Sequence, residues 1–253
     1  GNTSEFTGGA IKMASRGFSG FESVGVTSCL IAENNCSSGS GLFGQFNINS
    51  STIVSNIGGA GIGVSGADSG PSIIRNSIIY GNSSEGVGSF DADITYSLVE
   101  GGYLGTGNID LNPLFVDSEN GNYHLSDYSP AIGSGTSIGA QTTDIDGNPR
   151  PNPAGSNPDM GAYENSLGTP AHNSFIYVAT TGEDVGSVGV MDIPFKTIQA
   201  AINYAVAGDT VLIEEGTYVE NVTLGKDIVL GSRYLKTPEL GYIENTVIDG
   251  DAV

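Results

Sequence analysis

Short apolar runs recur along the first hundred residues, and they share one internal pattern. Four nine-residue segments align without gaps, starting at Val26, Ile48, Ile74 and Ile94. Each opens with a β-branched residue and carries an apolar pair at its fifth and sixth positions, which only Thr52 interrupts. Three of the four segments end in asparagine, at Asn34, Asn56 and Asn82. The pattern is that of an internal repeat.

The repeat predicts stacked coils. A single coil of this length cannot bury its own apolar face, but stacked coils build one continuous core. Short β-branched runs suit strands that are paired on both sides, and Gly-rich stretches near Gly8, Gly39 and Gly58 fit the corners. A β-sandwich would favour alternating hairpins without a repeated block. We therefore predict an all-β fold, a right-handed parallel β-helix (solenoid).

The asparagines at the segment ends have two expected roles. Asparagine tolerates left-handed backbone geometry at a strand end. Stacked asparagine side chains also bond to one another along a stack of strands. The sequence therefore predicts an asparagine ladder made of Asn34, Asn56 and Asn82.

After Gly102 the pattern changes to a loop-rich run with five prolines between Pro113 and Pro153. It contains N-P-L-F-V-D, Y-H-L-S-D-Y-S-P-A-I, T-D-I-D-G-N-P-R-P and P-D-M-G-A-Y-E in that order. From Asn108 to Glu164 it resembles the C-terminal end of bacterial pectate-lyase-like β-helix proteins, which implies a closing segment without chemistry of its own. Because proline removes ladder donors, we expect this closing segment to shield the exposed edge of the last coil.

One turn of the closing segment is a candidate metal site. Asp144, Asp146 and Asn148 alternate around Gly147 like the start of a calcium loop, although the distal glutamate of an EF-hand is missing. The alternative is a tight turn in which Arg150 pairs with Asp144 or with Asp159. Calcium is the one cofactor that the sequence indicates.

The last third of the chain carries a different pattern. Pro194 suits a first helical turn, apolar residues at Phe195, Ile198, Ile202 and Ala205 share one helical face, and Gly208 suits the stop. Strand cores are expected to begin at Val211, Ile228 and Val247. The motifs P-F-K-T-I-Q-A-A-I, G-D-T-V and G-T-Y-V-E-N resemble, from Tyr177 to about Gly250, the N-terminal end of the same β-helix superfamily. That resemblance implies an amphipathic helix that plugs the first coil.

The two ends therefore occur in permuted order. We expect coils and a closing segment in residues 1–164, a linker in 165–174, and a capping helix with opening coils in 175–253. Head-to-tail assembly, a tandem polyprotein, and a fragment or fold-back onto the chain's own coils each explain this order. The expected self-assembly ends are Thr246, Val247, Ile248 and Val253 on one side and Gly8 and Ile11 on the other.

The amino-acid composition limits the kinds of molecule that the protein is expected to bind. Eight basic against 28 acidic residues give a net charge of −20, which disfavours nucleic acid and anionic membranes. No apolar stretch reaches membrane-spanning length, so no membrane insertion is expected. Cys29 and Cys36 fit small core or turn residues, with a local disulfide as the alternative. The resemblance places the protein outside the cell or at a cell surface, in a bacterium.

Three function classes remain. An enzyme acting on polysaccharide needs a carboxylate pair or a basic residue beside calcium. On the coils, the nearest candidates for the carboxylate pair are Asp91 and Asp93, and the basic residues are Lys12, Arg16 and Arg75. His124 and His172 lack recognisable partners. An adhesin or polysaccharide-binding module would need an aromatic row, for which Tyr80, Tyr96 and Tyr103 are candidates. We favour a non-catalytic subunit that assembles head-to-tail with itself into an extracellular filament or surface fibre.

Overall fold

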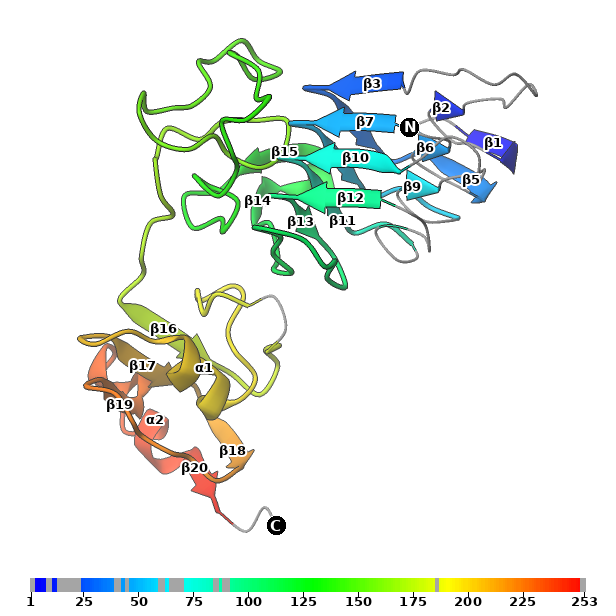
Figure 1. Cartoon of the computed structure of the whole chain (residues 1–253). Coiled ribbons are helices and arrows are strands. Elements are labelled where there is room, and N and C mark those ends of the chain that lie inside the picture. Colours follow the sequence, from blue (N-terminus) through cyan, green and yellow to red (C-terminus); the bar gives the residue numbers. More distant parts are fainter. Residues whose placement is uncertain are drawn as a thin grey trace. The chain divides into compact units, whose positions relative to one another are not determined.

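The computed structural model describes residues 3–7, 11–12, 24–38, 42–43, 46–58, 62–63, 71–83, 87, 92–184 and 187–250 (Figure 1). Contacts divide the chain into two compact units, Gly1–Ala171 (unit 1) and His172–Val253 (unit 2). The first part of the expected linker packs on unit 1, where Leu167 contacts the core and the Ala171 amide donates to the Asp127 carbonyl. The boundary therefore falls inside the segment 165–174.

Unit 1 is a parallel β-solenoid. Its coil strands are β1 (Thr3–Thr7), β2 (Ile11–Lys12), β3 (Val24–Thr27), β4 (Leu30–Ala32), β5 (Asn35–Ser38), β6 (Leu42–Phe43), β7 (Phe46–Asn49), β8 (Thr52–Val54), β9 (Ile62–Gly63), β10 (Ser72–Arg75), β11 (Ile78–Tyr80), β12 (Ala92–Thr95) and β13 (Leu98–Val99). They stack into the parallel sheets β12-β10-β7-β3, β13-β11-β8-β4, β2-β6-β9 and β1-β5. The predicted parallel β-helix is confirmed for the described coils.

The register of these sheets follows the sequence repeat. The openings of the four segments pair with one another: Val26 with Ile48, Ile48 with Ile74, and Ile74 with Ile94. All four side chains point into the core, as do the sixth positions Ile31, Ile53, Ile79 and Val99. Because a strand alternates its side chains between two faces, the fifth positions point to the outside of the coil. Stacked apolar residues at fixed positions thus build the core that no single coil has.

Each coil turns two corners through left-handed backbone. The third position of every segment has φ of 48–50°, at Ser28, Ser50, Asn76 and Tyr96. The eighth position is also left-handed, at Glu33, Ser55, Gly81 and Gly101. The expectation that the terminal asparagines take this geometry was wrong, because the preceding residue makes the corner and the asparagine follows it with its side chain turned inward.

The closing segment contains β14 (Phe115–Asp117), the 3-10 helix η1 (Ser118–Asn120) and β15 (Asn122–Leu125), with β14 and β15 antiparallel. Residues 104–110 cover the edge of the last coil, where Ile109 bridges to Leu98 and its amide donates to the Ser97 carbonyl. The later, proline-rich part lies instead against the outside of the β13-β11-β8-β4 sheet. There the Gly161 amide donates to the Asn76 carbonyl at 2.8 Å. The proline-rich run therefore covers the flank of the coils and not their last edge.

This cover explains the apolar pair in the repeat. Ile78 and Leu98, at fifth positions, are fully buried in a second cluster with Leu125, Ala131, Ile132 and Met160 of the closing segment. Thr52, the exception in the pattern, accepts a hydrogen bond from the Ala162 amide at 3.0 Å. The β13-β11-β8-β4 sheet is thus buried on both faces, as a near-continuous apolar run requires.

Unit 2 contains β16 (Phe175–Val178), α1 (Ile198–Tyr204), β17 (Thr210–Ile213), β18 (Gly216–Val219), β19 (Val229–Ser232), the 3-10 helix η2 (Arg233–Leu235), α2 (Gly241–Glu244) and β20 (Thr246–Asp249). The parallel sheets are β16-β17-β19 and β18-β20. Val247 therefore does not continue the row of Val211, because β20 pairs with β18. The chain makes two coils here, β17–β18 and then β19–β20.

Helix α1 covers the open side of the first of these coils (Figure 1). Its buried residues Ile198, Ala201 and Ile202 pack with Ile176 and Val211 of the strands. The helix is shorter than its sequence pattern predicts, since Thr197 caps it and Pro194 and Gly208 lie outside it. Glu220 completes the cap, because its carboxylate accepts from the amides of Ile198 and Gln199 at 2.8 and 2.9 Å.

Candidate functional site

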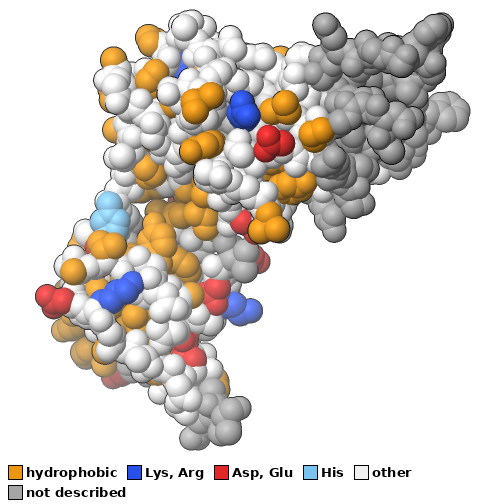
Figure 2. Space-filling model, in the orientation of Figure 1, with side chains coloured by type: hydrophobic (Ala, Val, Ile, Leu, Met, Phe, Trp, Pro, Cys, Tyr) orange, Lys and Arg blue, Asp and Glu red, His pale blue; other side chains and the backbone are white. Residues whose placement is uncertain are grey.

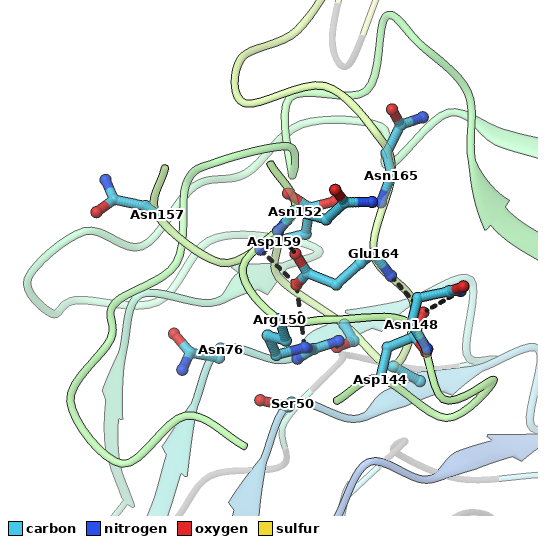
Figure 3. A network of polar contacts seen from close by, with 12 residues as sticks. Ser50, Asn76, Asp144, Asn148, Arg150, Asn152, Asn157, Asp159, Glu164 and Asn165 are labelled. Atoms are coloured by element: carbon cyan, nitrogen blue, oxygen red, sulfur yellow. Dashed lines mark hydrogen bonds and ion pairs between the residues drawn. The ribbon is translucent and has the colours of Figure 1, made fainter. Parts of the chain in front are cut away.

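The closing segment encloses a polar network whose charged residues Asp144, Arg150, Asp159 and Glu164 are buried (Figure 3). The Nε of Arg150 lies 3.0 Å from the Oε1 of Glu164, and both side chains are fully buried. The Nη2 of Arg150 donates to the Gly161 carbonyl at 3.0 Å. The predicted partners of Arg150 were Asp144 or Asp159, and the observed ion pair is with Glu164. Within the described part of the chain, the Nη1 of Arg150 has no hydrogen-bond partner.

Asp144, the first residue of the candidate calcium loop, organises a tight turn. Its Oδ1 accepts from the amides of Asp146 and Asn148 at 2.9 and 2.7 Å. Its Oδ2 accepts from the Asn148 side chain and from the Glu164 amide, both at 3.0 Å. These donors lower the pKa of Asp144 even though burial alone raises it. The carboxylate is thus satisfied from within the protein.

The other candidate calcium ligands point to different partners. The Asp146 carboxylate pairs with His124 Nε2 at 2.8 Å, and Asn148 turns its amide nitrogen to Asp144. Among the residues that the structure describes, no group of three or more His, Cys, Asp and Glu side chains is placed to hold a metal ion. The observed contacts are those of the tight-turn alternative, and calcium binding stays a prediction.

Asp159 has the most perturbed carboxyl of the network. Its two oxygens accept from the amides of Gly133 and Asn165, each at 2.7 Å, while the side chain is fully buried. Burial raises its pKa to about 7, against the lowering by these two donors, and Glu164 adds to the rise. Burial likewise raises the pKa of Glu164, in opposition to Arg150. Desolvation therefore raises the pKa of both carboxyl groups more than the single guanidinium of Arg150 lowers it.

The three repeat asparagines stack inside unit 1. The Nδ2 of Asn34 donates to Asn56 Oδ1 at 2.8 Å, and the Nδ2 of Asn56 donates to Asn82 Oδ1 at 2.9 Å. The same oxygens accept the backbone amides of Asn34 and Asn56. A second ladder, made of serines, was not predicted. Ser51, Ser77 and Ser97 occupy the fourth position of successive segments, and each hydroxyl accepts a hydrogen bond from the backbone amide at the same position one coil earlier. The recurrence of serine at that position is the sequence signal that would have indicated it.

The outer face of the β12-β10-β7-β3 sheet carries the nearest enzyme candidates. Arg75 is partly exposed and Asp93 is exposed, and the register places them diagonally on neighbouring strands. Lys12 lies in β2 without a described side chain, and Asp91 and Arg16 lie outside the described residues. In the view of Figure 2 charged side chains are sparse and most of the surface is uncharged.

The aromatic and histidine candidates are held by the protein itself. Tyr80 and Tyr96 pack against the cluster under the closing segment, and Tyr103 packs on the coil core. They therefore form no shared solvent-facing row. The rings of His124 and Tyr163 are in contact, with their centroids 4.1 Å apart, and His124 also bonds to Asp146. The Nε2 of His172 lies 2.7 Å from the Oδ1 of the buried Asp209. Cys29 is a free thiol. The side chain of Cys36 does not belong to the part of the chain that the structure describes.

The predicted assembly residues of unit 2 lie on an open strand edge. In the described residues, β19 pairs only with β17 and β20 only with β18. Ile248 is 46% exposed, whereas its register partner Tyr218, one coil earlier, is 3% exposed. Val247 and Val229 are also exposed, and Thr246 is partly exposed. On unit 1, Ile11 of β2 is 39% exposed. Gly8 and Val253 lie outside the described residues.

Comparison with known proteins gives one distant similarity. Pectate lyase PEL9 of Emericella nidulans is 33% identical over 78 residues, which are 30% of this chain and 18% of that protein. No protein-family model matches the sequence, and no solved structure matches it. The parallel solenoid and this similarity support a pectate-lyase-like β-helix. The resemblance to bacterial proteins stays a prediction. No helix of the described chain has the length and apolar character needed to span a bilayer.

Proposed function

We propose that this chain is a non-catalytic structural subunit, and that copies of it stack head-to-tail into an extracellular filament or surface fibre. The observation that carries the proposal is the exposure of Ile248 at a position where the preceding coil has a buried core residue. An inward-facing residue of a solenoid is buried by the next coil. A further β-helix coil is thus the natural occupant of this edge.

Two further properties of the edge support stacking. Among the described strands, β19 and β20 are each paired on one side, and a second parallel strand pair can add to such an edge through backbone hydrogen bonds. Leu230 of β19 is the register partner of the buried Val211, and it is only partly buried, so it adds apolar surface at the same edge. A head-to-tail contact between two different surfaces extends into a fibre unless its rotation closes a ring. Because the net charge of −20 opposes association, salt or divalent ions are expected to promote it.

Negative-stain microscopy and analytical ultracentrifugation test the filament. The wild-type chain is expected to form fibres at high concentration in salt, and Ile248→Lys is expected to abolish them because a buried lysine would meet the next coil's core. Leu224→Lys, at an exposed apolar residue of unit 2 outside β19 and β20, is the matched control. A wild-type chain that stays monomeric at high concentration, with and without calcium, contradicts the proposal. That result would leave the edge to further coils of a longer polypeptide.

The second candidate function is polysaccharide binding or degradation. It is favoured by the similarity to a protein named pectate lyase and by Arg75 beside Asp93 on an open sheet face. A lyase reaction on acidic polysaccharides, followed by the ultraviolet absorbance of the unsaturated product with calcium present, tests it. Activity that Arg75→Ala removes, with folding intact, would replace the structural proposal; binding without turnover would support a carbohydrate-binding role.

A further inference from the structure

Residues 129–165, here called the strap, cover the flank of the unit 1 coils. The strap is tied to the coils through Asn76, whose side chain accepts the Thr136 amide at 2.7 Å and whose carbonyl accepts the Gly161 amide. A third tie joins the Ala162 amide to Thr52. Beneath the strap, Ile78 is fully buried. Detachment of the strap would therefore expose an apolar sheet face to water.

The buried charges that hold the strap together do not balance. Asp144, Asp159 and Glu164 supply three carboxyl groups and Arg150 one guanidinium, and each of the four residues is less than 10% exposed. Asp159 is the tie between distant parts of the strap, because it accepts amides from Gly133 and from Asn165. Buried unpaired charge is costly, and a protein relieves that cost by taking up a proton.

We propose that the strap is a proton-dependent latch: it is held on the coils most firmly when the buried cluster around Asp159 carries a proton, and it loosens as that proton is lost toward neutral pH. The charged groups that face Asp159 are Glu164 and Arg150, with Asp144 acting through both. Asp127 reaches the cluster through the Asn165 side chain. The described coil residues that contact the strap here, Asn76, Thr52 and Ile78, are uncharged.

The direction of the pH effect follows from linkage. The pKa of Asp159 is raised from 3.8 to about 7 in the closed strap, so the closed form holds a proton that the open form releases between these values. The contribution of Asp159 to the stability of the closed strap is therefore greatest below about pH 4, falls as pH rises, and levels off above about pH 7. The raised pKa of Glu164 acts with the same sign. Asp144, whose pKa is lowered, weakens the closed strap only at more acid pH.

Hydrogen exchange measured by mass spectrometry between pH 5 and pH 8 tests the latch. After correction for intrinsic exchange rates, protection of strap peptides is expected to fall up to tenfold per pH unit from pH 5 to pH 7 and to stay level above it. Peptides covering β3 and β12, which lie in the sheet that the strap does not cover, serve as the internal reference and should not change. The variant Asp159→Asn should abolish the dependence, and Asp93→Asn, at an exposed carboxylate of the same unit, should retain it.

Two results would overturn the latch. One is strap protection that does not change between pH 5 and pH 7, or that changes only in step with the coil reference. The other comes from carboxyl carbon NMR of the wild-type chain, which needs no variant to fold: titration of Asp159 in the ordinary range near pH 4 removes the basis of the proposal. A midpoint near neutral pH in that titration supports it.

Discussion

Replacement of Asn56 removes the middle of the asparagine ladder. The fully buried Asn56 side chain accepts from the amide and the Nδ2 of Asn34, at 3.0 and 2.8 Å. It donates to the Ile31 carbonyl at 3.0 Å and to Asn82 Oδ1 at 2.9 Å. In Asn56→Ala the Asn34 amide loses its bond to Asn56 Oδ1, and the Ile31 carbonyl and Asn82 Oδ1 each lose one donor, although Asn82 Oδ1 keeps the backbone amide of residue 56.

The expected cost follows from these lost hydrogen bonds. A buried group that loses its acceptor costs about 1–3 kcal/mol, and each further buried hydrogen bond lost costs about 0.5–1.5 kcal/mol. With four hydrogen bonds of the Asn56 side chain removed and partial relaxation, we expect Asn56→Ala to lower the free energy of unfolding of unit 1 by about 3–5 kcal/mol. That is a large share of the ~5–15 kcal/mol of a typical domain. Asn56→Asp is expected to be at least as costly, because its carboxylate faces Asn82 Oδ1 without a proton to donate.

Urea denaturation followed by circular dichroism, with hydrogen exchange to separate the two units, measures the loss. The matched control is Asn47→Ala, which removes an exposed asparagine of the same coil and should change stability by less than ~0.5 kcal/mol. Equal effects of the two alanine variants, or a cost of Asn56→Ala below about 1 kcal/mol, would show that the ladder does not stabilise the stack. Exchange in β17 of unit 2 should be unchanged in both.

Three other substitutions test separate contacts. Thr52→Val leaves the buried Ala162 amide without its acceptor and should cost about 1–2 kcal/mol, seen as faster exchange in residues 158–164 with the coils unchanged. Ile78→Ala empties a fully buried site and should cost about 2–5 kcal/mol in urea denaturation, against a small effect for Ile73→Ala on the open face. Glu220→Gln weakens the cap of α1 and should lower the free energy of unfolding of unit 2, measured by thermal denaturation, by about 1 kcal/mol, whereas Glu215→Gln, at an exposed glutamate, should leave it unchanged.

The coil register was predictable because one periodic signal carries it. Apolar positions that recur in fixed order within each segment become the stacked rows of the core, so aligning the segments also aligns the strands. The left-handed corners were placed one residue too late. Their residues differ from coil to coil, as Glu33 and Gly81 do, and so leave no common side-chain signature.

The closing segment and unit 2 were harder to place from sequence because long-range contacts define them. Nothing near Arg150 in the sequence identifies Glu164 as its ion-pair partner, and Asp144 and Asp159 were equally plausible partners. The place of the proline-rich run on the flank depends on Asn76 and Thr52, far away in the chain. In unit 2 the spacing of apolar residues identified the strands but not the sheet that each strand joins. Val247, for example, lies in β20, which pairs with β18 and not with the sheet of Val211.

The constant nine-residue segment sets apart a variable part of each coil. Successive segments begin 22, 26 and 20 residues apart, yet their strands keep the same register. All of the difference in length therefore falls between the asparagine that ends one segment and the strand that starts the next. Leu42 of β6 and Ile62 of β9 still stack in the core within these stretches, so the added length lies on either side of such core positions. Peptides of chosen length are therefore suited to insertion between the segments, at one-coil intervals and outside the core positions.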